Sequence, residues 1–237
     1  VRGPRRQFTF SKLMAWVAFD RAVKSAEAFD LAGPRDHWRR LRDEIHQDVC
    51  ARGFDAGLNS FVQAYGEPQR AYHSRQHLEE CLLVLDEAKG FMQQPDLIEL
   101  ALWFHDAVYD PKSGENEALS AAMAVEALGG TSTAHEVARL ILLTKSHQPG
   151  EGPDDAWIID IDLAIFAQPA ARVAEYEQQI REEYGWVPEQ VYREKRAEVL
   201  RGFLAREPIY RTPWAREQFE TRAKENLRVL IDGLADG

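Results

Sequence analysis

Apolar residues recur at steps of three and four along most of the chain, and strict alternation of apolar and polar residues is rare. A repeat of that length places the apolar side chains on one face of a helix, whereas alternation would indicate strands. The pattern therefore predicts an all-α protein. The expected helices cover residues 11–29, 35–50, 55–65, 75–90, 95–108, 115–128, 134–145, 155–167, 169–184, 188–206 and 213–232.

Helix start and stop signals support several of these boundaries. Pro95 stands where a first-turn proline loses no hydrogen bond, and Thr212 can cap the last helix. Thr133 and Glu136 have the spacing of a capping box, and Gly129 begins a stop signal. The apolar segment 158–166 has the composition of a short buried strand, although its helical neighbours favour a helix.

The chain shows neither an internal repeat nor a low-complexity linker. We therefore expect residues 1–34 to form an N-terminal arm or helix and residues 35–237 to form a single helical domain.

Composition and charge exclude some classes of protein. The 237 residues are 45% hydrophobic and 29% charged, as in a globular protein with a buried core. The net charge of −10, without a basic stripe, disfavours a nucleic-acid polymer as partner. The sequence contains no apolar run of the roughly 18–20 residues that would span a membrane. The basic start and the apolar stretch after it resemble an export signal only faintly, because Asp20 and Arg21 interrupt the stretch.

The two cysteines, Cys50 and Cys81, do not form a CxxC pattern. We expect two reduced thiols in a cytoplasmic protein, although the sequence leaves a disulfide between them open.

The candidate functional residues are histidines and aspartates that lie in or beside apolar helical segments, where a plain helical bundle would have apolar residues. His73 and His77 are four apart, so both rings leave the same face of a helix. His105 and Asp106 follow the apolar run LALWF, where an unpaired carboxylate would cost several kcal/mol. The spacing of the two histidines suits two ligands of one metal ion, or one ligand with an acid/base group beside it. For His105 and Asp106, a metal ion would explain both residues at once, whereas the plain alternative is a core histidine and an aspartate that caps a helix or forms a salt bridge.

Asp160 and Asp162 are embedded in the apolar segment WIIDIDLAIF. They diverge by about 200° on a helix, so we expect only one to face a metal. The other would accept outer hydrogen bonds or cap a turn, and the sequence pattern leaves open which of the two aspartates is the ligand. His147, at the end of an apolar helix, is a candidate substrate contact or ligand of a second metal, and Lys145 is a further candidate substrate contact. Arg70 is a candidate clamp for an anionic substrate.

The ordered set His77, His105 with Asp106, and Asp162 resembles the HD superfamily of metal-dependent phosphohydrolases. The likeness is closer to a bacterial branch of predicted HD-type phosphohydrolases and covers about residues 35–232. The matching stretches are RAYH, FHDAVYD, NEALSA, TKSH, DIDL, GFLAREPIY and RAKENL. The resemblance implies an HD-domain helical bundle, with an N-terminal helical arm and C-terminal helices added.

The resemblance also implies a set of roles. His73 would be the proton donor, Asp106 would bind the ion and orient the attacking water, and Glu117 becomes a further substrate-site candidate. The implied cofactor is one divalent ion, either Mn, Fe, Co, Ni, Zn or Mg. The implied reaction is hydrolysis of a small phosphoester, such as a nucleotide, by metal-activated water.

Two alternatives stay open beside this reaction. One is a metal-containing nucleotide-binding or regulatory module without turnover, and the other is an oxidative di-iron enzyme. We expect a small phosphorylated substrate as partner and no membrane. The sequence leaves the oligomeric state open, a homodimer included.

Overall fold

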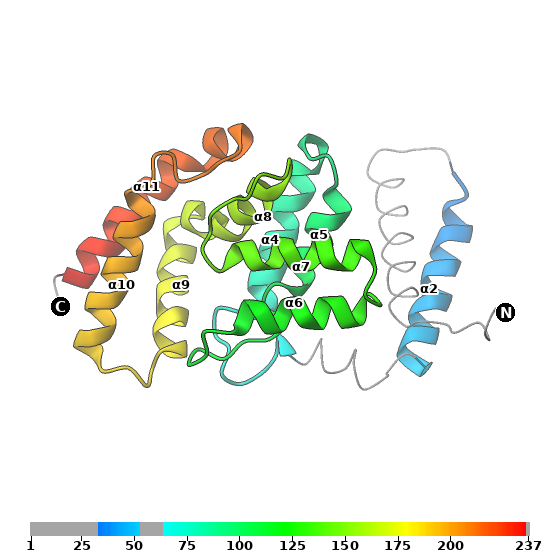
Figure 1. Ribbon diagram of the computed structural model, residues 1–237, viewed down its shortest axis with the longest axis horizontal. Coiled ribbons are helices and arrows are strands. Elements are labelled where there is room, and N and C mark those ends of the chain that lie inside the picture. Colours follow the sequence, from blue (N-terminus) through cyan, green and yellow to red (C-terminus); the bar gives the residue numbers. More distant parts are fainter. Residues whose placement is uncertain (1–32, 53–63, 236–237) are drawn as a thin grey trace. The chain divides into compact units, whose positions relative to one another are not determined.

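The computed structural model describes residues 33–52 and 64–235, and these are all-helical, with no strand among them (Figure 1). The all-α prediction is therefore confirmed. The helix expected over 11–29, and nearly all of the one expected over 55–65, lie outside the described residues.

The observed helices follow the predicted order closely. They are α2 (Arg35–Arg52), α4 (Arg75–Ala88), η1 (Lys89–Phe91), α5 (Pro95–Phe104), α6 (Asn116–Ala127), α7 (Ser132–Thr144), α8 (Asp155–Asp162), η2 (Leu163–Ala167), α9 (Ala170–Glu183), α10 (Glu189–Leu204) and α11 (Pro213–Ala235).

The chain divides into two compact units, residues 1–63 and residues 64–237. Helix α2 belongs to the first unit, and the domain boundary expected after residue 34 stays a prediction. All the candidate site residues lie in the second unit. None of the helices that the structure describes is both long and apolar enough to cross a membrane.

Local capping explains several helix boundaries, and it corrects one. Pro95 is the first residue of α5, and the hydroxyl of Thr212 accepts from the Ala215 amide at 3.2 Å. The capping box expected at Thr133 is wrong, because Thr131 is the N-cap of α7 and its hydroxyl accepts from the Ala134 amide. Gly129 and its neighbour adopt positive φ angles after α6, as a helix stop requires.

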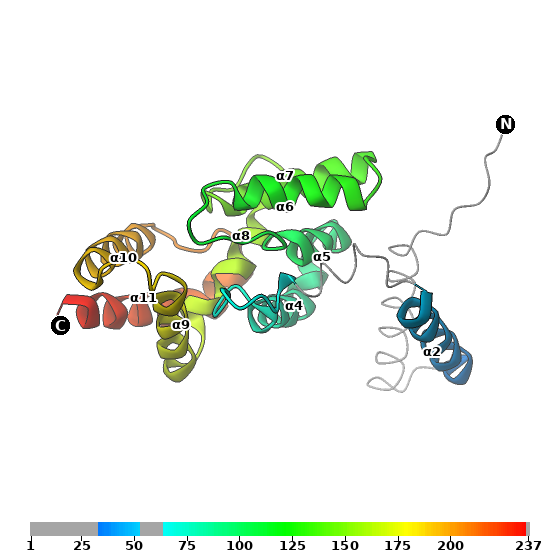
Figure 2. The same ribbon diagram turned by 90° about the horizontal axis from the view of Figure 1, so that it is seen from below.

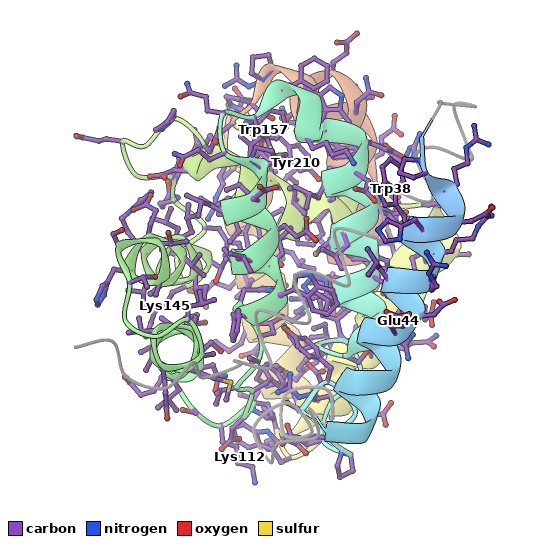
Figure 3. The ribbon with its side chains drawn as sticks, turned by 90° about the vertical axis from the view of Figure 1, so that its right-hand side faces the viewer. Trp38, Glu44, Lys112, Lys145, Trp157 and Tyr210 are labelled. Atoms are coloured by element: carbon purple, nitrogen blue, oxygen red, sulfur yellow. The ribbon has the colours of Figure 1, made fainter. Side chains whose placement is uncertain are left out.

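Within the second unit, α6 packs along α7, α10 packs along α11, and α4 contacts both α5 and α8 (Figures 1 and 2). The core lies between these layers, and Trp157 and Tyr210 are among its packed side chains (Figure 3). The candidate ligands lie in α4, directly after α5 and at the end of α8, so the packing of this core sets the geometry of the candidate site.

The segment that the composition left open as a strand is helical. This segment forms the end of α8 and then η2. A side chain of α11 donates hydrogen bonds to carbonyl oxygens at the end of η2 and just after it. The amide of Asn226 donates to the carbonyl oxygens of Phe166 and Gln168, at 2.8 and 3.0 Å. This contact fixes the chain directly after Asp162.

Candidate metal centre

Four side chains from three helix ends meet in one cluster: His77 of α4, His105 and Asp106 after α5, and Asp162 at the end of α8. Nε2 of His77 lies 3.1 Å from Nε2 of His105 and 3.1 Å from Oδ1 of Asp162. Nε2 of His105 lies 3.0 Å from Oδ2 of Asp106. The four predicted metal ligands are thus brought together.

The end of α5 explains how two adjacent residues both reach the cluster. We expected a helix through residue 108, but α5 ends at Phe104. The chain then turns, with the amide of Ala107 donating to the carbonyl of Phe104 at 3.0 Å. On a continued helix, neighbouring side chains would diverge by about 100°. The turn instead directs His105 and Asp106 to the same point.

The donor set suits a cation. Nδ1 of His105 donates to the carbonyl oxygen of Leu102 at 2.7 Å, so Nε2 of the neutral ring presents a lone pair. That lone pair faces the carboxylates of Asp106 and Asp162, which also offer only lone pairs. Such convergent acceptors repel one another unless a cation or an added proton lies among them. Mixed nitrogen and oxygen donors fit a divalent transition metal ion.

The pKa shifts of the clustered side chains also indicate that negative charge is concentrated there. Burial alone would lower the pKa of His105, yet the charge of Asp106 and the hydrogen bond to it raise this pKa to about 9. Burial would raise the pKa of Asp162, but hydrogen bonds from His147 and His77 hold it well below its usual range. The cluster therefore attracts positive charge, and a metal ion is one way to supply it.

Cys81 lies beside the cluster and is a competing ligand. Its sulfur is 3.8 Å from Nε2 of His77, and the thiol is buried and free. Burial raises the pKa of this thiol well above its ordinary value, whereas a bound metal ion would itself displace the thiol proton. The Asp106 carboxylate lies 3.6 Å from Nε2 of His77 and 3.0 Å from Nε2 of His105, so Asp106 and Cys81 are both candidates for the fourth position beside His77, His105 and Asp162.

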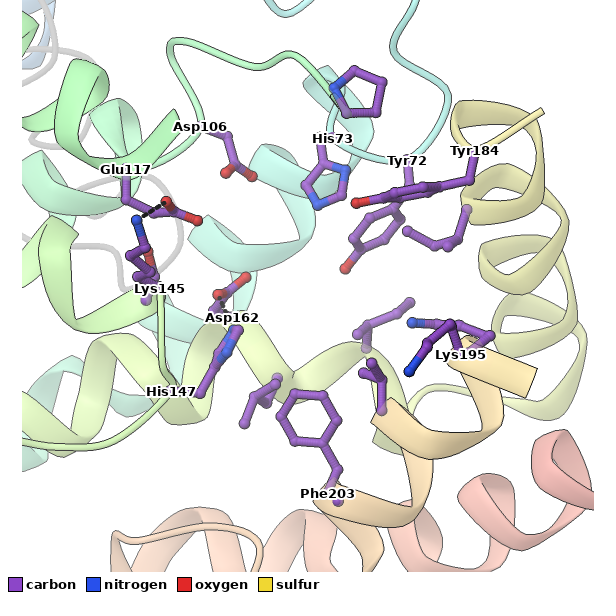
Figure 4. A pocket seen from close by; sticks show the side chains of 18 of the residues that line it. Tyr72, His73, Asp106, Glu117, Lys145, His147, Asp162, Tyr184, Lys195 and Phe203 are labelled. Atoms are coloured by element: carbon purple, nitrogen blue, oxygen red, sulfur yellow. Dashed lines mark hydrogen bonds and ion pairs between the residues drawn. The ribbon is translucent and has the colours of Figure 1, made fainter. Parts of the chain in front are cut away.

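The cluster opens onto a cavity of about 1050 Å³. Asp106, Asp162 and His73 line one part of it, and Lys195 and Phe203 of α10 line the opposite wall (Figure 4). A ligand in the cavity would therefore reach the cluster and the side chains of α10 together.

Three of the predicted substrate contacts line this cavity. His147 adopts a positive φ of 48° and places Nε2 at 3.1 Å from Oδ2 of Asp162. Lys145 donates to the carbonyl oxygen of Gly114 at 2.6 Å, and its Nζ lies 4.0 Å from the carboxylate of Glu117 (Figure 4). These polar groups form the wall nearest the cluster.

Arg70, the fourth predicted contact, is placed elsewhere. Its guanidinium is buried and donates to the carbonyl oxygens of His73, Asp106 and Ala107, at 2.7 to 3.1 Å. These bonds occupy its donors and keep the side chain out of the cavity lining. Arg70 therefore holds the His73 and Asp106 segments together instead of meeting a substrate.

Asp160 faces away from the cluster. Its carboxylate accepts from the backbone amides of Arg211 and Thr212, with the shortest distances at 2.8 and 2.7 Å. It fixes the segment before α11 to α8, and it touches none of the four clustered residues. It accepts hydrogen bonds, as expected, but they come from this distant backbone.

Two residues that the sequence did not indicate complete the site. The buried carboxylate of Glu183 accepts from Nδ1 of His73 at 2.7 Å, and from the hydroxyl of Tyr109 at 2.7 Å. Glu183 ends α9, where the helix dipole disfavours an acidic residue. An acidic residue at the end of a helix is the sequence signal that could have identified Glu183 as a site candidate.

Tyr72 also lines the cavity, and Figure 4 shows its hydroxyl directed into it. The hydroxyl is buried and has no hydrogen-bond partner among the described residues. A buried hydroxyl without a partner is costly, so this one is available to a ligand.

Comparison with known families gives one matching model, "Glycosyl hydrolases family 15", over residues 1–96. The match covers fewer than half of the residues. It includes His73 and His77 and ends before His105, Asp106 and Asp162.

The curated relatives are trehalases. They include a trehalase of Thermoplasma volcanium, 44% identical over 61 residues, which are 26% of this chain and 10% of that protein. A trehalase of Mycobacterium tuberculosis is 42% identical over 67 residues, 28% of this chain and 10% of its own length. Trehalase 2 of Sulfolobus acidocaldarius is 37% identical over 65 residues, 27% of this chain and 11% of that protein.

The chain thus spans about a tenth of the length of the curated relatives it matches. No solved structure matches it.

These findings overturn the identity that the motifs suggested. The expected HD-type phosphohydrolase, its phosphoester reaction and its phosphorylated substrate are wrong, because the matching family is a glycoside hydrolase family and the relatives are trehalases. The comparisons instead support a resemblance between part of this chain and part of the sequence of glycoside hydrolases.

Proposed function

We propose that the chain is a hydrolase whose second unit binds a divalent metal ion through His77, His105, Asp106 and Asp162. The observation that supports this proposal is the convergence of two histidine nitrogens and two carboxylates at a cavity wall. The shortest nitrogen–oxygen separations are 3.0 and 3.1 Å. Ligand atoms that each lie about 2.1 Å from one ion are themselves about 3.0 to 3.5 Å apart, so these separations fit donors that share an ion.

When bound, the ion would supply a nucleophile near neutral pH by lowering the pKa of water. The residues of the chain would do the rest. The carboxylate of Asp106 lines the cavity and would orient the attacking water. His73, on the same wall, would donate a proton to the leaving group.

A sugar is the substrate class that we propose for this hydrolase. The support comes from the glycoside hydrolase family model and from the trehalases, which share part of their sequence with this chain. The cavity is lined by the kinds of side chain that bind sugars in proteins. Tyr184, Trp186 and Phe203 present aromatic faces, while Glu117 and Lys145 present polar groups.

The test combines metal analysis with a substrate panel on the full chain. The protein is stripped with a chelator and reloaded separately with Mn, Fe, Co, Ni, Zn or Mg. Each form is then assayed for hydrolysis of trehalose and of a panel of other glycosides, esters and amides. We expect one metal to restore turnover and the stripped protein to have none.

The matched variants are Asp106→Asn and Asp110→Asn. Asp110 is exposed and does not line the cavity, so its variant controls for general effects of losing a charge near the site. We expect Asp106→Asn to lower kcat by at least about 10²-fold and Asp110→Asn to change it little. Full turnover in the stripped protein would contradict the metal proposal, and turnover of esters or amides alone would contradict the sugar.

A further inference from the structure

Glu183 makes more polar contacts than any candidate residue that the sequence indicated. Its Oε1 accepts from three successive backbone amides, those of Ala71, Tyr72 and His73, at 2.9, 2.8 and 2.9 Å. The carboxylate is buried and comes from α9, more than a hundred residues further along the chain. It therefore fixes the backbone from which the His73 and Tyr72 side chains enter the cavity.

The other oxygen of Glu183 determines where the proton of His73 lies. Oε2 is 2.7 Å from Nδ1 of His73 and 2.7 Å from the hydroxyl oxygen of Tyr109. An ionised carboxylate only accepts, so both of these partners must donate. Burial would raise the pKa of Glu183, but the hydrogen bond and charge of His73 lower it to about 2. The carboxylate is therefore ionised, and Nδ1 of His73 carries a hydrogen.

The ring of His73 is also fixed in direction. It stacks on Tyr109 with ring centroids 4.1 Å apart and planes inclined by 22°. With Nδ1 bound to Glu183, Nε2 is the ring nitrogen left for a ligand. His73 lies between Asp106 and Tyr72 at the rim of the cavity (Figure 4). A group bound at the metal cluster would meet this ring from the side opposite Glu183.

We propose that Glu183 is a positioning residue that keeps a hydrogen on Nδ1 of His73, so that the ring takes up its second hydrogen at Nε2 and serves from that atom as the acid of the reaction. This inference rests on the proposed hydrolase function. The N–H bond at Nε2 breaks as the proton passes to the leaving oxygen, while hydroxide from water bonds to the other fragment. The proton that the attacking water gave up restores His73, and the carboxylate of Glu183 stays ionised throughout.

The test is the tautomer of His73, read from the ¹⁵N shifts of its ring nitrogens in the full chain, with His73→Asn used for assignment. Above the pKa of His73, we expect a hydrogen on Nδ1 in the wild type. In Glu183→Gln the amide oxygen can still accept from the backbone, so its NH₂ group would face His73. Nδ1 must then accept, and the hydrogen moves to Nε2.

Glu177→Gln is the matched control. Glu177 is also on α9 and also holds a tyrosine hydroxyl, that of Tyr192 at 2.7 Å, without touching His73. We expect its His73 signals to match those of the wild type. An unchanged tautomer in folded Glu183→Gln would overturn the proposal, and so would a wild-type ring that carries its hydrogen on Nε2. The second outcome needs no variant to fold.

The kinetic readout uses the substrate found by the panel. In Glu183→Gln we expect kcat to fall by about 10² to 10⁴-fold, with metal content and KM little changed. A change in KM alone, with kcat retained, would overturn the role. The tautomer can be measured without metal or substrate. Failure of the hydrolase proposal would therefore appear as missing metal or turnover, whereas failure of this inference would appear in the ¹⁵N shifts.

Discussion

At the scale of single residues, hydrogen-bond partners separate those that could interact with a ligand from those that hold the fold. Arg70 and Asp160 looked like site residues in the sequence, yet most of their hydrogen bonds go to backbone groups of the protein. Tyr72 and Glu183 looked ordinary, yet one has a buried hydroxyl without a partner and the other holds His73. A charge in an apolar sequence requires a partner, but the sequence does not name that partner.

Tyr72→Phe tests the unpartnered hydroxyl. Because no described residue bonds to this hydroxyl, its removal costs no hydrogen bond and relieves a desolvation penalty. We expect the free energy of unfolding to rise by about 1 kcal/mol. If the hydroxyl serves a ligand, KM for the substrate rises at the same time. Thermal unfolding and steady-state kinetics check the two effects, and a destabilised variant would show that the hydroxyl has a partner in the protein.

Glu183 should make the stability of the protein depend on pH in acid. The pKa of Glu183 is lowered from 4.5 to about 2 in the folded protein, chiefly by His73 against the opposing effect of burial. The unfolded chain therefore binds the proton first as pH falls. This contribution to stability is complete above pH 4.5 and is lost as pH falls through about 2.

The measurement compares chemical unfolding of the wild type and Glu183→Gln at several pH values from 5 to 2, a window set by those two pKa values. We expect the gap in stability between them to narrow as the pH falls. A gap that stayed constant across the range would mean that Glu183 has the same pKa in both states.

At the scale of elements, the repeat of apolar residues predicted the helices well, and the failures occurred at helix ends. The segment after Phe104 reads as one helix because its apolar pattern continues, yet α5 stops there. Tertiary contacts decide this ending, since Arg70 binds the carbonyl oxygens of Asp106 and Ala107 from 36 and 37 residues away. A repeat along the sequence cannot report such a contact.

Arg70→Met tests the role of this arginine as a link between elements. The substitution leaves three carbonyl oxygens without their donor near the site, and the side chain of Arg70 is fully buried. We expect unfolding to become easier by about 3 kcal/mol, and metal affinity to fall because Asp106 loses its support. Arg75→Met, on an exposed arginine paired with Glu79, is the control and should change little. Equal effects of the two variants would refute the linking role.

At the scale of the whole molecule, the sequence indicated the cluster but misled on identity. The spacing of His77, His105, Asp106 and Asp162 predicted residues that the fold brings together. The family attached to that spacing was wrong, because the comparisons find a glycoside hydrolase model over residues 1–96 and trehalases as relatives. A convergent set of ligands specifies a kind of chemistry, whereas a substrate depends on the rest of the cavity.

The two-unit organisation gives a prediction of its own. All four clustered residues lie within residues 64–237, which form one of the compact units. We expect this piece, expressed alone, to unfold cooperatively and to bind the divalent ion with the affinity of the full chain. Calorimetry on both forms checks this expectation. A piece that folds but binds no ion, beside a full chain that does, would contradict the expectation that residues 64–237 suffice.

The central claim is that the cluster binds a divalent ion, and the most direct test compares two aspartates on the same helix. Asp162 belongs to the cluster, whereas Asp160 holds the backbone of Arg211 and Thr212. The measurement is the metal content and affinity of the wild type, Asp162→Asn and Asp160→Asn. We predict about one ion per chain in the wild type and in Asp160→Asn, and affinity lowered by at least about 100-fold in Asp162→Asn. Equal metal binding by all three proteins, or none by the wild type, would contradict the claim.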